Sequence, residues 1–258
     1  MEDITAVIIQ KLDDIEEQEH VTILHAVESG SRAWGFASPD SDYDVRFIYV
    51  RSGADYLALN EPRDVIEWQL DEVLDINGWD IKKVLKQFYR SNAGLFEWSN
   101  SPIVYKTTEA WGMIYDAARD YFSVKAAAYH YYGTAKSTEQ QYLQDDTVRY
   151  KKYLYALRPL LASRYILANH CPPPVLFEEL LEAEIPDDLR NGIARLLEIK
   201  KYSGESEYNT QIPVIRDFIR EEINRQKVII DSLEDDRSYD WQQLNDAFRF
   251  LFWQENRL

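Results

Sequence analysis

The spacing of apolar residues changes near residue 109, and this change limits the folds that the chain can adopt. Before it, β-rich runs dominate, namely "VTILHAV" (21–27), "YDVRFIYV" (43–50) and "RDVIEWQLDEVLDI" (63–76). Beyond it, apolar residues recur at helical spacing and no convincing strand follows. Short β-rich runs are typical of strands, so the sequence predicts an N-terminal α/β part followed by an all-helical part.

Two helices are expected to accompany the strands. Residues 4–19 place apolar side chains at helical spacing, and "GWDIKKVLKQFYRS" (78–91) does the same. Residues 63–76 fit one or two strands. The order helix–strand–strand–strand–helix therefore predicts a small α/β (α+β) domain with a mixed sheet.

The chain beyond this unit is expected to form an all-α helical domain. Three prolines in "HCPPPV" (170–175) separate two helices, because proline cannot continue a helix. We expect domains over 1–110 and 111–258, with the boundary somewhere within 102–123. The expected helices cover 109–121, 124–143, 145–169, 175–183, 187–202, 212–232 and 239–256.

Net charge and cysteine content limit which binding partners and which cellular compartment we expect for this chain. The formal net charge is -16, which argues against binding long duplex nucleic acid, because that binding depends on Lys and Arg neutralising phosphates. A small phosphorylated ligand held through metal ions stays open. The one cysteine, Cys171, cannot form an intrachain disulfide. With no signal-like N-terminus and no apolar run of about 18 residues, we expect a cytoplasmic protein without a membrane segment.

Closely spaced aspartates follow a Gly-Ser turn in "SGSRAWGFASPDSDYDVRF" (29–47). Alternate side chains of a strand share one face, so Asp42 and Asp44 are expected to point the same way. Two neighbouring carboxylates are unfavourable unless a cation lies between them. Mg²⁺ prefers oxygen ligands, commonly one or two carboxylates together with substrate phosphates. The pair is therefore a candidate Mg²⁺ site.

The turn before the aspartates has the features of a phosphate cradle. Gly30 allows a close backbone approach, and the Ser31 hydroxyl with nearby N–H groups suits a phosphate. Arg32 adds charge-assisted hydrogen bonds. A phosphate cradle beside a metal-binding carboxylate pair is typical of phosphoryl or nucleotidyl transfer with two metal ions.

Two other interpretations of the aspartates were weighed. A calcium loop that begins at Asp40 needs Gly at its sixth position and Glu at its twelfth, where this chain has Val45 and Arg51. A solvated acidic turn fits "SPDSD" but explains neither the upstream "GSR" nor the alternation that continues into an apolar strand. The metal interpretation accounts for all of these features together.

These residues resemble the signature of the DNA polymerase β-type nucleotidyltransferase superfamily, which has Gly-Ser after the first strand and a D-x-D pair on the next. The longer "GSRAWGF…SDYDVRF" resembles the RNA-repair-associated (RlaP-type) branch. The resemblance continues through "LDINGWDIKKVL", "SNAGLFEWSNSPIVY", "YHYYGTAK" and "KKYLYALRPLLA", about two thirds of the chain. It implies a nucleotidyltransferase fold for the N-terminal domain.

The resemblance also implies a third acid on a later strand. The family pattern places it between apolar residues at the end of a strand, shortly before a helix. Asp75, between Leu74 and Ile76, fits best, and Glu67 is the next choice. Asp71 is a further candidate. Asp80 is expected instead in the first turn of the following helix, where an acid favours the helix dipole.

By the same resemblance, Asp42, Asp44 and Asp75 bind two Mg²⁺ ions, with Mn²⁺ as the alternative, and Gly30 with Ser31 holds the triphosphate. The helical half offers further contacts in "RYKKYLYALRPLL" (149–161), where basic side chains share one helix face. Two interpretations of that face stay open: it binds a triphosphate, or it is a solvated basic face. Tyr155 likewise either stacks on a base or lies at the edge of the core. The candidate residues there are Lys151, Lys152, Tyr155 and Arg158.

The expected activity is transfer of a nucleoside monophosphate from a nucleoside triphosphate to a hydroxyl, with release of pyrophosphate. The acceptor is an RNA end, with tRNA included, a protein or a small molecule, and the RNA-repair resemblance favours RNA. The alternative is a non-catalytic nucleotide-binding module, antitoxin-like or regulator-like, that keeps the fold. The complete D-x-D pair and the plausible third acid favour the enzyme.

Overall fold

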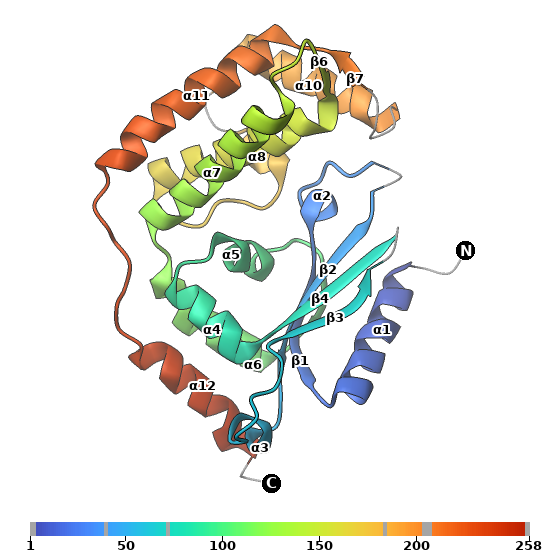
Figure 1. Cartoon of the computed structure of the whole chain (residues 1–258), viewed down its shortest axis with the longest axis vertical. Helices are drawn as coiled ribbons and strands as arrows, with labels where there is room; N and C mark the ends of the chain where they lie inside the picture. Colours follow the sequence, from blue (N-terminus) through green and yellow to red (C-terminus); the bar gives the residue numbers. More distant parts are fainter. Residues whose placement is uncertain (1–3, 39–40, 71–72, 183–184, 203–207, 256–258) are drawn as a thin grey trace. The chain divides into compact units, whose positions relative to one another are not determined.

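The computed structural model describes residues 4–38, 41–70, 73–182, 185–202 and 208–255 (Figure 1). Their contacts group the chain into two units. The first unit takes its described residues from Met1–Ala33, Asp42–Phe122 and Arg237–Leu258. The second takes them from Trp34–Ser41 and Ser123–Asp236. No helix in the described parts of the chain is long and apolar enough to cross a membrane.

The first unit is built on a mixed sheet, as the sequence predicts. The strands lie in the order β3-β4-β2-β1-β5. Strand β4 runs parallel to β2, whereas the pairs β1–β2, β1–β5 and β3–β4 are antiparallel. The strands are β1 (Thr22–Ser29), β2 (Tyr43–Val50), β3 (Val65–Leu70), β4 (Leu74–Asp80) and β5 (Val104–Thr107).

Helices cover both faces of this sheet (Figure 1). Helix α1 (Ile4–Glu19) packs Ile8, Leu12 and Ile15 against one face. The other face is covered by α4 (Ile81–Tyr89), α5 (Ala93–Ser99) and α6 (Glu109–Ala118), and α12 (Gln242–Glu255) joins the same apolar cluster. The short elements of this unit are α2 (Gly30–Ala33), α3 (Gly53–Tyr56) and the 3₁₀ turn η1 (Arg119–Tyr121).

The second unit is mainly helical. Helices α7 (Val124–Tyr142), α8 (Tyr150–Asn169) and α11 (Pro213–Ser232) pack against one another. They are joined by α9 (Phe177–Leu180) and α10 (Asp187–Tyr202), and β6 (Thr147–Arg149) pairs with β7 (Tyr208–Thr210). Helix α8 is buried over most of its surface, and Pro159 lies within it.

Several details differ from the sequence-based expectations. A strand pair forms after residue 109, and the helix expected to start at residue 145 begins only after β6. The helix expected over 175–183 is limited to α9. Strand β5 was not expected, and residues 78–80 belong to β4 instead of the helix expected over 78–91.

The last helix of the chain packs with the first unit. Trp241 stacks on Tyr89 with ring centroids 3.6 Å apart, and the Tyr121 hydroxyl donates to the Asp240 carbonyl at 2.6 Å. These contacts secure the segment that leads into α12. Conversely, Trp34 and Phe36 pack on Tyr155 of the second unit.

Candidate active site

The Gly-Ser turn lies directly against the Asp44 carboxylate. Strand β1 ends at Ser29, which pairs with Asp44 in β2. Gly30 follows with φ of 63°, and a Cβ built there would lie 2.0 Å from Asp44 Oδ2. Both the left-handed backbone and this close approach require glycine. Ser31 is buried next to it, and within the described residues its hydroxyl has no recorded hydrogen-bond partner.

The structure brings Asp44 and Asp75 together on neighbouring strands. Parallel β2 and β4 place the two residues directly opposite each other in register. Asp42, exposed, immediately precedes β2 and lies close enough to raise the pKa of Asp44. The three acids named by the sequence therefore come from one end of two adjacent strands. Asp75 itself stands near the start of β4, not at the strand end before a helix as expected.

An arginine that the sequence analysis did not single out connects the two carboxylates. Arg46 Nη2 donates to Asp44 Oδ1 at 3.0 Å and to Asp75 Oδ2 at 2.6 Å. Its Nη1 donates to the carbonyls of Val45 and Asp75. The Arg46 side chain is 18% exposed, so it acts as a half-buried internal cation between the acids. Its position two residues after Asp44, on the same strand face, was a signal available in the sequence.

The surroundings of Asp44 act on the pKa of its carboxyl in opposite directions. Burial raises the pKa of its carboxyl above the usual value, the Arg46 guanidinium lowers it, and the nearby Asp42 and Asp75 raise it. The net effect is a raised pKa. The cluster therefore favours additional positive charge, supplied by a proton or by a cation.

A fourth acid, Glu28, lies under the turn and was also missed. It is 1% exposed and accepts hydrogen bonds from the Asp44 N–H at 2.8 Å and the Tyr105 hydroxyl at 2.5 Å. Burial raises the pKa of the Glu28 carboxyl, although both hydrogen bonds lower it. An acid at the end of the mainly apolar run "ILHAVE" was the signal for it. Through its bond to the Asp44 backbone, Glu28 fixes the start of β2 against β1.

Arg32 is held beside the same acids. Its Nε donates to the Asp42 carbonyl at 3.0 Å, and its guanidinium lies 3.6 Å from the centroid of the Tyr43 ring. It also helps to lower the pKa of Glu28, which places its charge near that carboxyl. Arg32 is thus a preorganised cation at the rim of the turn.

The other candidates for the third acid lie elsewhere. Glu67 is exposed in β3 and pairs with Asn77, farther along β4 than Asp75. Asp80 ends β4 and caps α4, accepting from the Lys82 N–H at 2.7 Å, so it precedes the helix instead of lying in its first turn. Asp71 falls outside the described residues. Of the described candidates, Asp75 is the one paired with Asp44.

Across the described ranges, no group of three or more His, Cys, Asp or Glu side chains is arranged to hold a metal ion. The donor types nevertheless suit Mg²⁺, because Asp42, Asp44 and Asp75 offer carboxylate oxygens. Arg46 occupies one oxygen of Asp44 and one of Asp75, and its recorded bonds leave Asp44 Oδ2 and Asp75 Oδ1 to other partners.

The helical candidates belong to the second unit, and one of them is not where the sequence placed it. Arg158 is 2% exposed, donates to the Val175 carbonyl at 3.2 Å and lies 4.5 Å from the centroid of the Trp34 ring. It is an interior residue of its unit because α8 is buried on most sides, so the basic face is shorter than expected. Tyr155 packs edge-on against Trp34 and is half-buried, as a tyrosine at the edge of the core would be.

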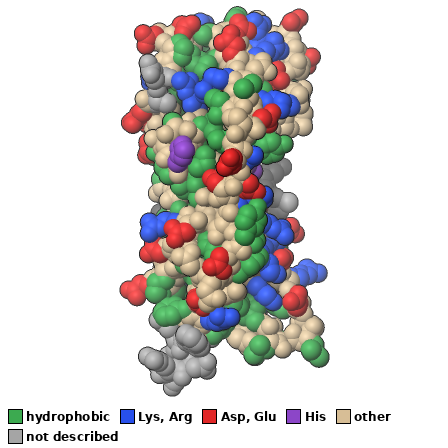
Figure 2. All heavy atoms as spheres, turned by 90° about the vertical axis from the view of Figure 1, so that its left-hand side faces the viewer, with side chains coloured by type: hydrophobic (Ala, Val, Ile, Leu, Met, Phe, Trp, Pro, Cys, Tyr) green, Lys and Arg blue, Asp and Glu red, His purple; other side chains and the backbone are tan. Residues whose placement is uncertain are grey.

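The two lysines of α8 stay near the surface of the second unit. Both are half-buried, and Lys152 Nζ lies 3.9 Å from the centroid of the Tyr142 ring. On the face of the molecule shown in Figure 2, basic and acidic side chains are interspersed and form no continuous basic surface. This distribution fits the negative net charge.

The sequence matches the RNA repair pathway DNA polymerase beta family, RlaP, over residues 4–250. The chain belongs to this family. The resemblance carried by "GSRAWGF…SDYDVRF" is thereby confirmed. An uncharacterized protein, YcgL, of Bacillus subtilis (strain 168) is 42% identical over 223 residues, which cover 84% of this chain and 85% of that protein.

Among solved structures, the crystal structure of a nucleotidyltransferase-like protein from Exiguobacterium sibiricum 255-15 aligns over 96% of this chain and 80% of its own. The identity is 10% and the TM-score 0.28, too low to support an argument. The assignment to the RlaP family therefore rests on the sequence match, and the carboxylate site lies within the matched residues.

Proposed function

We propose that this RlaP-family protein transfers a nucleoside monophosphate from a nucleoside triphosphate to a hydroxyl acceptor, with release of pyrophosphate. The observation that carries the proposal is the pairing of Asp44 with Asp75 beside a turn that accepts only glycine. A carboxylate pair next to a close-approach turn provides both a cation site and a phosphate site. Membership of a polymerase beta family supports the same chemistry.

In this proposal Asp42, Asp44 and Asp75 hold Mg²⁺, or Mn²⁺ in its place. These carboxylates would hold the ions, which would supply Lewis-acid polarisation of the phosphoryl group and activation of the hydroxyl. The chain itself binds and orients the triphosphate. Gly30 allows the phosphates to approach the backbone, and the hydroxyl of Ser31 and the guanidinium of Arg32 donate to them.

Lys151 and Lys152, in α8 of the second unit, are proposed as further phosphate-binding residues. Tyr155 and Arg158 are proposed to support the helix that carries these lysines. Arg158 donates a hydrogen bond to the Val175 carbonyl, and both side chains pack on Trp34. The proposed acceptor is an RNA end, including that of a tRNA, in keeping with the description of the family. The protein is proposed to bind only the end of the RNA, because its negative net charge disfavours binding along an extended nucleic-acid surface.

The test is transfer of label from α-labelled nucleoside triphosphates, one base at a time, to total RNA, total protein or a small-molecule extract in Mg²⁺. Asp44→Asn and Asp75→Asn are expected to abolish transfer, whereas Glu67→Gln is the matched carboxyl-to-amide control and retains it. Loss of transfer in Glu67→Gln but not in Asp75→Asn would move the third acid to β3. Absence of transfer to every acceptor would contradict the proposal.

One observation favours a second candidate, a non-catalytic nucleotide-binding module. Arg46 already pairs with both Asp44 and Asp75, and the described residues hold no ready group of three metal ligands. A protein of this kind binds triphosphate without turning it over. Equilibrium binding of labelled triphosphate, measured beside the transfer assay, separates the two candidates, because binding without transfer supports the module alone.

A further inference from the structure

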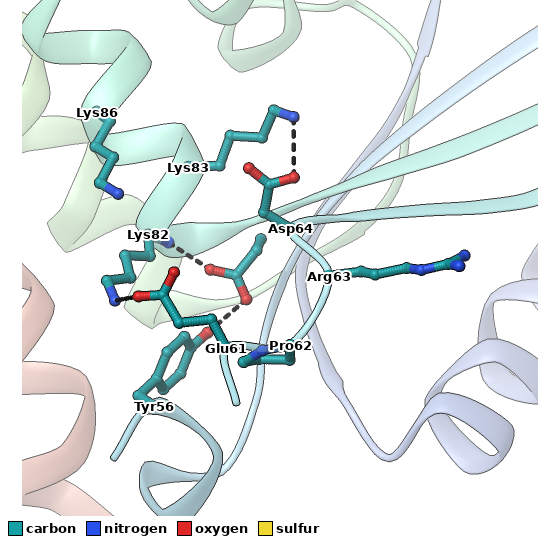
Figure 3. Close-up of a pocket in the computed structure, with 9 residues that line it drawn as sticks. Tyr56, Glu61, Pro62, Arg63, Asp64, Lys82, Lys83 and Lys86 are labelled. Atoms are coloured by element: carbon teal, nitrogen blue, oxygen red, sulfur yellow. Dashed lines mark hydrogen bonds and ion pairs between the residues drawn. The ribbon is translucent and has the colours of Figure 1, made fainter. Parts of the chain in front are cut away.

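A cavity of about 340 Å³ opens at the end of β4 that is remote from the carboxylate site. Its walls come from the segment between α3 and β3 and from the first turns of α4 (Figure 3). Asp80 at this end of β4 and Asp75 near the other are five residues apart, or roughly 16 Å along a strand. The cavity is therefore separate from the site described above.

Three lysines of α4 line this cavity. Lys82 and Lys86 lie one helical turn apart on the same face, and Lys83 extends in another direction, towards Asp64 (Figure 3). Lys86 is exposed and has no recorded partner among the described residues. The guanidinium of Arg63 points away from the lysines in Figure 3, so the positive charge of the cavity comes from α4.

The carboxylates that pair with two of these lysines are held loosely. Lys82 Nζ lies 3.3 Å from Glu61 Oε1, and Lys83 Nζ lies 3.3 Å from Asp64 Oδ1. The Glu61 side chain is 81% exposed and that of Asp64 62% exposed. Ion pairs of such exposed groups are weak, of the order of 0–1 kcal/mol. A ligand with two or more negative charges therefore can displace both carboxylates.

The buried acid of the cavity does not compete for the lysine ammonium groups. Asp80 is 3% exposed, and its two oxygens accept from the Tyr56 hydroxyl at 2.8 Å and the Lys82 N–H at 2.7 Å. Each of its oxygens thus already accepts one hydrogen bond, from α3 or from the start of α4. Lys82, Lys83 and Lys86 are therefore left to bind an anion.

We propose that this cavity binds a small anion that carries two or more phosphate groups. Lys82, Lys83 and Lys86 are its ligands, and Glu61 and Asp64 occupy their ammonium groups in its absence. The size of the cavity falls in the range of small-molecule sites, which begins at about 300 Å³. The negative net charge of the chain disfavours a long polyanion. This proposal is independent of nucleotidyl transfer.

The test is titration of the full-length chain with inorganic pyrophosphate by calorimetry in the presence of a metal chelator. The chelator removes metal-dependent binding at the aspartates, so failure of the transfer proposal leaves this result unchanged. The combined Lys82→Gln, Lys83→Gln and Lys86→Gln variant is expected to lose at least about 10-fold in affinity, the value of one charged hydrogen bond. Lys227→Gln is the control, since that lysine forms an exposed pair with Asp231.

The opposite change gives a sharper result. Glu61→Gln with Asp64→Asn removes the competing carboxylates and is expected to raise the pyrophosphate affinity several-fold, which a misfolded variant cannot do. Binding that the lysine variant retains, or a lower affinity in the acid variant, would overturn the proposal. So would lysine-dependent binding of a short RNA oligonucleotide without any binding of pyrophosphate, because the ligand would then not be a small anion.

Discussion

Replacing Arg46 by Met tests whether this arginine stands in for a bound cation. The substitution leaves Asp44 and Asp75 side by side without their shared donor. Removing one partner of a fully buried pair costs about 3–5 kcal/mol, and of an exposed pair about 0–1 kcal/mol. The side chains here are 18%, 25% and 28% exposed, so we expect a loss of about 2 kcal/mol in the free energy of unfolding in chelator.

Magnesium should reduce the loss in free energy of unfolding that Arg46→Met shows in chelator. In the wild type, a divalent cation must compete with the guanidinium for the Asp44 and Asp75 carboxylates. In Arg46→Met it does not, and ligand at 100 times its dissociation constant stabilises a protein by about 2.7 kcal/mol. We therefore expect Mg²⁺ to restore most of the lost stability of the variant and to stabilise the wild type less.

Urea unfolding in chelator and in Mg²⁺ measures both quantities. The matched control is Arg51→Met, because Arg51 is also half-buried and its ion pair is with Glu19, whose carbonyl it contacts at 3.1 Å and whose carboxylate it contacts at 3.9 Å. Its guanidinium also lies 5.3 Å from the centroid of the Tyr49 ring. That variant should lose stability without becoming responsive to Mg²⁺. If Mg²⁺ stabilises the wild type as much as Arg46→Met, or rescues both variants equally, Arg46 does not compete with a metal.

Three further outcomes are expected. Glu28→Gln should flatten the pH dependence of the free energy of unfolding measured in urea. Burial raises the pKa of the Glu28 carboxyl in the folded protein above 4.5, so the wild type loses stability as the pH rises from about 4.5 through that raised pKa. The glutamine amide does not titrate and gives no such loss. A steeper loss in the variant would contradict this. Gly30→Ala should lower the free energy of unfolding by at least about 1 kcal/mol and weaken triphosphate binding, because the alanine Cβ would displace the Asp44 side chain. An unchanged triphosphate affinity would show that this contact is unimportant for binding. Arg158→Met should cost about 1–3 kcal/mol and alter tryptophan fluorescence, since it leaves the Val175 carbonyl unpaired and Trp34 uncovered; an unaltered spectrum would argue against this packing.

The elements predicted best are those whose pattern is local. Strand β2 begins and ends where the alternation in "YDVRFIYV" does, and α1 matches its apolar spacing. Strand β5 could not be found in this way, because it has four residues and depends on pairing with β1. Strands β6 and β7 are shorter still, with three residues each, and they join segments far apart in the sequence.

The start of α4 shows a competition between local signals. Residues 78–80 were expected in the helix, yet they continue β4, where Gly78 lets the Phe47 ring lie against the backbone: a Cβ there would be 2.1 Å from Phe47 Cε2. Asp80 then caps the helix. The tertiary contact of a neighbouring strand overrides the helical spacing of the sequence, and the helix begins at the first residue after its cap.

The candidate site shows the same division between local and non-local information. Asp42, Asp44 and Gly30 were found because their spacing along the chain is itself the signal. The position of Asp75 opposite Asp44 follows from the parallel pairing of β2 with β4, which no single-strand pattern contains. Arg46 was missed because a charged residue in an alternating strand is usually read as facing solvent, and Glu28 was missed although it lies in the buried run of β1. Once the strands are paired, both charges lie against Asp44, and Arg46 offsets part of the negative charge of the carboxylate cluster from within. A metal ion that is to bind Asp44 Oδ1 or Asp75 Oδ2 must therefore displace Arg46 from that oxygen.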